Sequence, residues 1–263
     1  MDKYLEIIRI RFLMMLAYRT NYYTGIIIYI INIGAYYFLW KAIYGARGEV
    51  EGVSMVQMTT YIAIAWMARA FYFNNIDREI ANDVRDGKVA TELIRPYNYL
   101  LTKLMQALGE GLFRIFLFSL PGMIIVALIF PVNIPVEPEL WFYFLVSITF
   151  SFIINTQINI LTGLSSFFLM NNGGLIRAKR VLIDVFSGLV IPINLYPLWA
   201  QDIFKFLPFQ SISYTPSMIF SKAFSYGELI NALVMQGVWS LILILPIQII
   251  WVYAKRKVIV QGG

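Results

Sequence analysis

The sequence predicts an all-α integral membrane protein that forms one domain, 1–263, with six transmembrane helices. Charged residues occupy only 14% of the 263 positions, against roughly 25% in soluble domains, and 59% of positions are hydrophobic. Several apolar segments reach the length of about 20 residues that a helix needs to cross a bilayer. Lys and Arg flank these segments, so the net charge of +6 reflects the inside-positive bias of membrane proteins rather than a nucleic-acid partner.

The expected elements follow in order along the chain. Residues 1–22 form an amphipathic helix on the lipid surface, because apolar Leu5, Ile8, Phe12 and Met15 recur at helical spacing. Full spans are expected at 23–42, 55–73, 107–130, 140–163 (with an extension towards Met170) and 229–253. The remaining crossing is 181–195, an apolar stretch of only about 15 residues. Turns or loops are expected at 45–52, 131–138 and 171–180.

The distribution of basic residues sets the expected orientation. Of the 21 Lys and Arg residues, 15 lie in the N-terminal helix, in 74–103, in 171–180 or at the C-terminus. The opposite side receives only Lys41, Arg47, Lys205 and Lys222. We therefore expect a multi-pass protein with both termini in the cytosol. The first residues lack the pattern of a cleaved signal peptide, so the first span should stay in the membrane.

The residue inventory excludes most catalytic chemistry. The chain has no Cys and no His, which removes thiol nucleophiles, disulfides, His-based metal sites and Ser-His-Asp triads. It also lacks the G-x-x-x-x-G-K-[ST] phosphate loop, so it is not expected to bind ATP itself. We expect neither an enzyme nor a metal protein.

The polar segment 74–103, between the second and third spans, is the strongest candidate functional site. Its first part, 77–86, has charged residues at helical spacing, and Gly87 can adopt the left-handed conformation that ends a helix. Pro96 then ends the next short segment. The candidate site residues in this segment are Asp77, Arg78, Glu79, Asp83, Arg85, Asp86, Gly87, Leu93 and Pro96. The alternative is a solvated helix with no partner.

The order of these parts resembles the permease subunit of type-2 ATP-binding-cassette (ABC) exporters, and in particular a drug-export branch. The resemblance rests on the order and spacing of short motifs over nearly the whole chain. They are Gly87-Lys88-Val89, Glu92-Leu93-Ile94-Arg95-Pro96, Leu207-Pro208-Phe209, Pro216, Trp239 and the final Gly262-Gly263.

That resemblance implies a dimer of permeases, of the same or a related chain, bound to two copies of an ABC ATPase. The helix within 74–103 would be the coupling helix that docks on the ATPase, and ATP and Mg would be bound by that partner. It also implies a bacterial cytoplasmic membrane and efflux of an amphipathic compound, drug, lipid-like molecule or peptide.

The fourth span carries a polar stripe. Its members recur every three or four residues and so share one helix face: Ser151, Asn155, Asn159, Thr162 and Ser166. Such side chains need hydrogen-bond partners within a membrane. They predict a translocation path or a permease–permease seam, and ordinary packing between helices is the alternative.

Region 196–227 is broken by Pro197, Pro208 and Pro216, and such backbone at membrane depth must be shielded by protein or line water. The resemblance to type-2 ABC exporters implies that this is a re-entrant outer segment before the sixth span, which caps the exit route. Its aromatic residues are candidates for an outer gate: Tyr196, Trp199, Phe206, Phe209 and Tyr214. An interfacial aromatic belt without a gating role is the alternative.

Charged residues within spans are few. Glu110 and Arg114, four residues apart, are expected to form an ion pair, and Arg69 and Asp184 are also expected to be structural. A secondary transporter would need more ionisable groups at depth, and an embedded enzyme would need a nucleophile and a base. A channel or scaffold that does not use ATP remains the alternative function.

Overall fold

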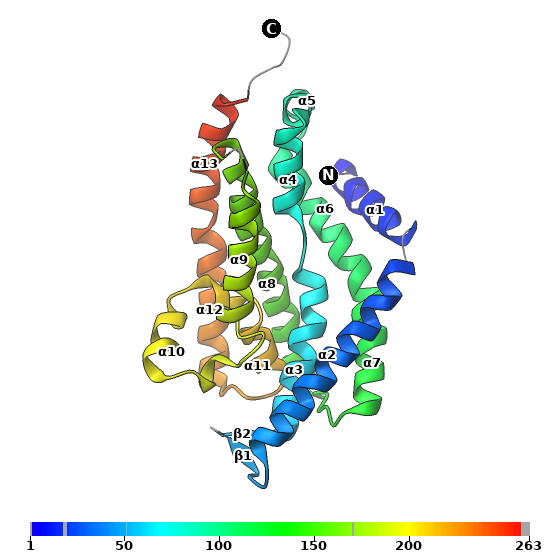
Figure 1. Cartoon of the computed structure of the whole chain (residues 1–263), viewed down its shortest axis with the longest axis vertical. Helices are drawn as coiled ribbons and strands as arrows, with labels where there is room; N and C mark the ends of the chain where they lie inside the picture. Colours follow the sequence, from blue (N-terminus) through cyan, green and yellow to red (C-terminus); the bar gives the residue numbers. More distant parts are fainter. Residues whose placement is uncertain (1, 18–19, 51, 170, 259–263) are drawn as a thin grey trace.

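Long helices run between two ends of the molecule in the computed structural model, which describes residues 2–17, 20–50, 52–169 and 171–258 (Figure 1). One end, here called the α4 end, holds α1 (Asp2–Ala17), α4 (Ile76–Arg85) and α5 (Lys88–Ile94). The opposite end, here called the β end, holds strands β1 (Glu49–Val50) and β2 (Val53–Ser54). The chain between residues 45 and 52, expected as a turn, thus contributes to a short antiparallel hairpin.

Within the described ranges, four helical stretches are long and apolar enough to cross a membrane. They are Thr24–Tyr44 of α2 (Thr20–Tyr44), Tyr99–Ile129, Pro138–Phe167 and Tyr226–Arg256. These four correspond to the spans predicted at 23–42, 107–130, 140–163 and 229–253. Pro138–Phe167 comprises α8 (Pro138–Leu164) and a 3₁₀ turn (Ser165–Phe167), and Met170 lies outside the described residues.

The predicted second span is α3 (Met55–Tyr72), a full helix that begins at a capping box between Ser54 and Gln57. It is not among the four stretches, and most of its residues are buried inside the protein. Because other helices surround α3, it does not need the uniformly apolar surface of a helix that faces lipid.

The predicted fifth span differs most from the structure. Helix α9 covers Gly173–Phe186, so the basic stretch expected as a loop at 171–180 is largely helical and the apolar residues 187–195 largely are not. The run from Leu175 to Phe186 contains good helix formers, and it continues the helix through the basic residues because Lys179 is buried against other elements. At about 1.5 Å per residue, the 14 residues of α9 are shorter than a bilayer core.

Two boundaries also differ. The N-terminal helix α1 ends at Ala17 and α2 begins at Thr20, so residues 20–22 belong to the first span rather than to the surface helix, and Arg19 lies outside the described residues. Helix α6 (Tyr99–Arg114) begins inside the segment 74–103, because the Asn98 side chain caps it by accepting from the Leu101 amide at 3.0 Å.

Proline explains two irregularities in the long helices. A π-helical turn, Ile115–Ser119, joins α6 to α7 (Leu120–Ile129) just before Pro121. In the last span, α12 (Tyr226–Ile242) and α13 (Ile244–Arg256) meet at Leu243, where Pro246 cannot donate to the carbonyl of Ile242.

The region between α9 and α12 is divided into short helices, as its prolines predict. They are η3 (Ile193–Leu195), α10 (Leu198–Lys205), η4 (Pro208–Ser211) and α11 (Tyr214–Phe220). Helix α11 packs between α3 and α8 and six of its residues are buried, whereas α10 lies on the surface.

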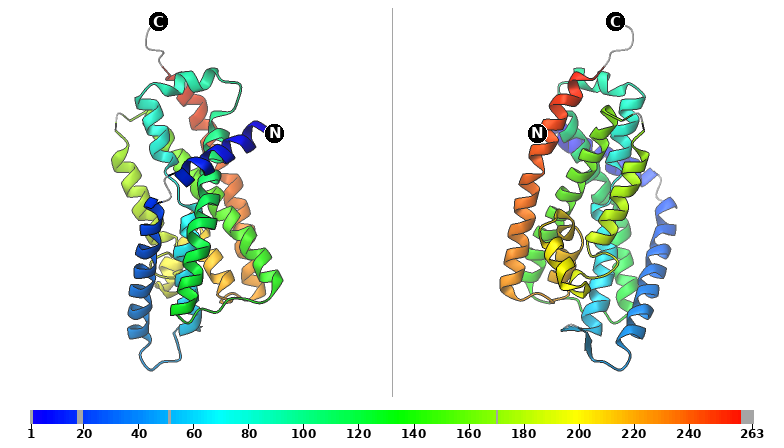
Figure 2. Two further views of the ribbon diagram at one scale, coloured as in Figure 1. Left: turned by 90° about the vertical axis from the view of Figure 1, so that its right-hand side faces the viewer. Right: turned by 60° about the vertical axis from the view of Figure 1, so that its left-hand side comes forward.

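The core has two main parts. One surrounds α8, whose Phe152, Ile154 and Leu164 pack with α3, α4 and α13, and the other lies between α2 and α3. Helix α2 stands at the edge of the bundle in both views of Figure 2, and α1 crosses α6 near the α4 end.

Candidate coupling site

Helices α4 and α5 meet at a turn at one extreme of the molecule, where α5 lies across the end of the bundle; this segment is called the α4–α5 hairpin below (Figures 1 and 2). Gly87 between the two helices has φ of 69°, the left-handed conformation expected from the sequence. Helix α5 stops at Ile94, two residues before Pro96. The helix, the turn and the stop predicted for this segment are therefore confirmed as local structure.

The candidate coupling residues fall on two faces of the hairpin. Arg78, Arg85, Asp86, Gly87 and Pro96 are exposed and form, with Ile94, the outer face. Ile94 is 85% exposed, an unusual environment for a large apolar side chain, and the exposed cations Arg85, Lys88 and Arg95 share this end of the hairpin.

The other four residues belong to the inner face. Asp77 is completely buried, Glu79 and Asp83 are partly buried in ion pairs, and Leu93 packs on the main core. These four residues therefore attach the hairpin to the rest of the molecule, whereas the outer face is exposed.

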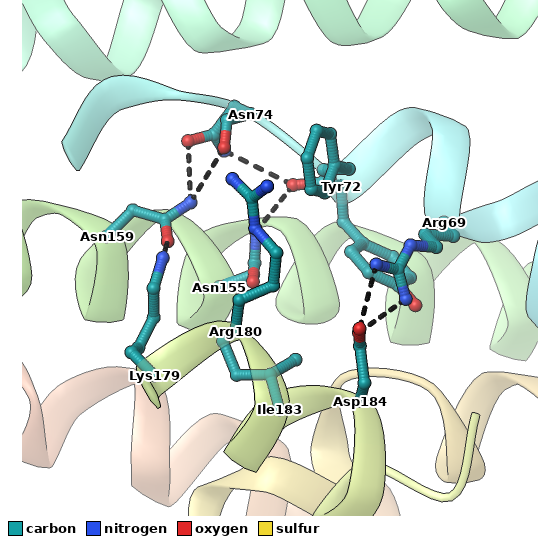
Figure 3. A pocket seen from close by; sticks show the side chains of 10 residues that line it. Arg69, Tyr72, Asn74, Asn155, Asn159, Lys179, Arg180, Ile183 and Asp184 are labelled. Atoms are coloured by element: carbon teal, nitrogen blue, oxygen red, sulfur yellow. Dashed lines mark hydrogen bonds and ion pairs between the residues drawn. The ribbon is translucent and has the colours of Figure 1, made fainter. Parts of the chain in front are cut away.

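A buried polar network lies directly beneath α4 (Figure 3). The Nζ atom of Lys179, on α9, lies 2.8 Å from Oδ2 of Asp77 and also donates to Oδ1 of Asn159 on α8. The Nδ2 atom of Asn159 donates to Oδ1 of Asn74 at 2.8 Å. Three elements, α4, α8 and α9, are thus joined to the α3–α4 connection within one cluster.

The same network satisfies the backbone where α3 ends. Asn155 of α8 donates to the carbonyl of Tyr72 at 2.7 Å, and Asn159 of α8 donates to the carbonyl of Asn74 at 3.3 Å. Buried carbonyls at a helix end need such donors. Side chains of α8 supply them, so the chain can leave α3 and enter α4 without losing these hydrogen bonds.

These contacts place the predicted polar stripe of the fourth span. Asn155 and Asn159 bond to the α3–α4 connection, and Ser151 donates to the Ser211 carbonyl of η4 at 3.0 Å. Thr162 and Ser166 donate to carbonyls of their own helical stretch. All five thus have partners inside one chain. The role of the stripe as a translocation path or dimer seam stays a prediction.

Ion pairs fix the neighbouring helices to the hairpin. Glu110 and Arg114 of α6 pair as predicted, and Arg11 of α1 joins them, with its Nη2 atom 2.8 Å from Oε2 of Glu110 and in contact with Glu79 of α4. Burial acts to lower the pKa of Arg11, but the carboxylates of Glu79 and Glu110 outweigh it and raise that pKa. The charge of Arg11 is therefore stable, and α1 is held to both α6 and α4.

Two further ion pairs join helices of the bundle. Arg69 of α3 binds Asp184 of α9 through two contacts, and Lys103 of α6 lies 2.7 Å from Oδ2 of Asp83. The ring of Phe73, where α3 ends, has the guanidinium groups of Arg69, Arg114 and Arg180 within 5.2–5.6 Å of its centre. Such cation–π contacts are worth about 0.5–2 kcal/mol each.

The sequence does not indicate Lys179 as a site residue, because its basic residues predict a loop at 171–180. Its helical spacing from Ile176 and Ile183, both buried, was the available signal that this side chain faces inward. No pattern in the sequence indicated Phe73, which is a single aromatic residue at the end of an apolar span.

Close packing brings α4 against α8. A Cβ atom at Gly163 would lie 2.9 Å from Cβ of Ile80 and 3.1 Å from Cα of Asp77. Glycine therefore allows the backbone of α8 to lie in close contact with α4.

Three of the candidate gate residues, Tyr196, Phe209 and Tyr214, pack around Phe186 and Phe204, and the other two lie apart from them. Trp199 and Phe206 are 69% and 75% exposed near α10, whereas Tyr196 packs on Phe204 with ring centres 5.1 Å apart. Phe209 packs on Phe186 at 6.0 Å, and Tyr214 packs on Tyr61 of α3 at 6.2 Å. The gating function stays a prediction.

The comparison with known protein families is decisive for the class of protein. The family model described as ABC-2 family transporter protein matches residues 30–262, which include the greater part of α2 and every helix from α3 to α13. No curated protein matches the chain. The match covers the α4–α5 hairpin, the network beneath it and all four membrane-length helices. The chain therefore belongs to the ABC-2 family of membrane transporters, as a permease subunit.

Proposed function

We propose that this permease exports its substrate with energy from ATP hydrolysed by a separate ABC ATPase, which docks on the outer face of the α4–α5 hairpin. The observation that carries the proposal is the combination of an exposed tip with a buried anchor. The outer face offers Arg85, Asp86 and Ile94 to a partner, and Asp77 of the same hairpin is fully buried in the network with α8 and α9.

The contacts suggest how movement of the hairpin would reach the membrane helices. Asp77 would move α9 through its ion pair with Lys179, and Ile80 would move α8 through its close contact with Gly163. Glu79 would move α1 through its ion pair with Arg11. Because α4 touches each of these helices, a small displacement of the hairpin would shift them together rather than bend one element.

The proposal extends to topology and assembly. The four membrane-length helices, with α3 and the short α9, would give six crossings, and the hairpin would lie in the cytosol with both termini. Two permeases, of this chain or a related one, would pair with two ATPase subunits in a bacterial cytoplasmic membrane. The substrate would be an amphipathic compound, drug, lipid-like molecule or peptide, and the re-entrant segment with its aromatic residues would form the outer gate.

The hairpin can be tested with charge reversal on its outer face. R85E and D86K should keep the permease folded but reduce capture of its partner ABC ATPase, and should abolish the change in ATP hydrolysis that the permease causes. K205E, which reverses an exposed Lys paired with an Asp three residues away on α10, is the matched control. If R85E and D86K capture and regulate the ATPase like wild type, docking at this face is wrong. If no ATPase accompanies the wild-type chain from its native membrane in several detergents, a channel or scaffold is favoured.

A further inference from the structure

A second cavity, separate from the network under α4, lies between α1, the α4–α5 hairpin and the first turns of α6. Its volume is about 520 Å³, within the range of roughly 300–1,000 Å³ typical of ligand sites. Helix α1 contributes an apolar wall of Ile7, Ile10 and Met14, and the other walls are mainly polar. Exposed Ile10 and Met14 make this wall continuous with the outer surface of α1.

Three side chains that line this cavity carry buried polar atoms with no hydrogen-bond partner in the part of the chain that the structure describes. They are Nε of Arg11, Oγ1 of Thr102 and Oε1 of Gln106, and Thr102 is only 6% exposed. Buried polar atoms are normally paired because an unmade hydrogen bond is costly. Arg11 Nε needs an acceptor, Gln106 Oε1 needs a donor, and the Thr102 hydroxyl can serve either.

The charges of the cavity point to a ligand with both signs. Four cations (Arg11, Lys88, Arg95 and Lys103) and two carboxylates (Asp83 and Glu92) line it. Lys103 lies 2.7 Å from Asp83, and Arg95 lies 3.1 Å from Glu92. A simple anion would meet both carboxylates, whereas a phosphate joined to an ammonium group can pair with the cations and the carboxylates together.

The position of the cavity points to a lipid. Thr102, Lys103 and Gln106 lie in the first two turns of the membrane-length helix Tyr99–Ile129, at the depth where headgroups lie when a helix leaves the hydrocarbon. The apolar wall of α1 would follow the acyl chains. We propose that this cavity binds the headgroup of an ethanolamine phospholipid, with its phosphate accepting from Thr102 and the lining cations and its ammonium group donating to Gln106 and the lining carboxylates. This inference does not depend on the ATPase.

The test is lipid retention by the purified full-length permease, measured by native mass spectrometry. Dioleoyl-phosphatidylethanolamine should be retained better than dioleoyl-phosphatidylcholine, because the methylated ammonium of choline has no N–H to donate. Dioleoyl-phosphatidylglycerol should be intermediate, because it has hydroxyl donors but no positive charge. T102V and Q106L should each lower retention of the ethanolamine lipid about tenfold, the usual effect of losing a hydrogen bond to a charged group.

T149V is the matched control, because Thr149 is exposed on α8 and donates to the carbonyl of Leu145 in its own helix. It should not change lipid retention. T102V should keep or raise the Tm in lipid-free detergent, since it removes an unpaired buried hydroxyl, and added ethanolamine lipid should raise the Tm of wild type more than that of the variant. Equal retention of ethanolamine and choline lipids would overturn the proposal, as would preference for phosphatidylglycerol or wild-type retention by both cavity variants.

Discussion

Asp77 and Lys179 form a buried ion pair between α4 and α9, with Oδ2 of Asp77 lying 2.8 Å from Nζ of Lys179. The residues are 102 positions apart in the chain, and Asp77 has no exposed surface. A buried charge with no partner is far less stable than a pair. The position of α4 is therefore tied to that of α9, and the pair can be tested by removing its charges separately and together.

D77A should destabilise the permease by about 3–5 kcal/mol, because it leaves the ammonium group of Lys179 buried without its carboxylate. The double variant D77A/K179M should recover part of this loss, since neither charge then remains. Thermal unfolding in detergent measures both effects. The Tm of K179M alone completes the comparison. If the Tm losses of D77A and K179M simply add in the double variant, the two residues act independently.

Replacement of Gly163 by Ala should separate α4 from α8. The new methyl group would lie 2.9 Å from Cβ of Ile80, so one helix must shift, at a cost of about 1–3 kcal/mol. G227A is the matched control, because a Cβ at this position in α12 meets no atom within 4 Å and Ala favours a helix. We expect a lower Tm for G163A alone, and equal Tm values for the two variants would contradict the close contact.

Asn159 should matter more than Ser166, although both belong to the polar stripe. N159A removes the link between Asn74 and Lys179 and leaves buried groups unpaired, which costs about 1–3 kcal/mol. Ser166 donates to the Gly163 carbonyl of its own helical stretch, so S166A should change stability by less than about 0.5 kcal/mol. Thermal unfolding gives the comparison. If N159A folds with wild-type stability yet abolishes export, a translocation path is favoured over packing.

An ion pair at the β end of the molecule should respond to acid. Oε2 of Glu137 lies 2.6 Å from Nζ of Lys222, and the hydrogen bond from Lys222 lowers the pKa of Glu137 below its ordinary value of 4.5. Because the pKa of Glu137 is lower in the folded state than in the unfolded state, the ion pair stabilises the fold at pH values above the unfolded-state pKa. This contribution disappears as the pH falls through the folded-state pKa. E137Q should therefore have a slightly lower Tm than wild type near pH 7 and an equal Tm in strong acid. A difference that persists in acid would contradict the ion pair.

Local signals in the sequence were sufficient for the outer part of the candidate site. Gly87 and Pro96 mark the turn and the stop of the hairpin, and both depend on the backbone preference of one residue type. The membrane-length helices were equally accessible, because lipid imposes a long apolar run on any helix that it surrounds.

The anchor of the hairpin could not be predicted in the same way. Asp77 pairs with Lys179, and Arg69 pairs with Asp184. Each pair is separated by more than 100 residues in the sequence, so no local spacing encodes it. The bounds of α9 were wrong for a related reason. Charged residues indicate a loop only when they face water, and Lys179 faces a carboxylate and an amide inside the protein.

The environment of α3 constrains how this chain enters a membrane during synthesis. The helix contains Gln57, Thr59, Thr60 and Arg69, and an Arg alone costs up to about 2.5–3.5 kcal/mol when a segment partitions into lipid by itself. In the folded protein the ion pair between Arg69 and Asp184 offsets part of this cost. Helix α3 should therefore insert poorly as an isolated segment at the translocon. It would be retained through its neighbours α2 and α8, which makes the assembly of this permease cooperative from its second segment onward.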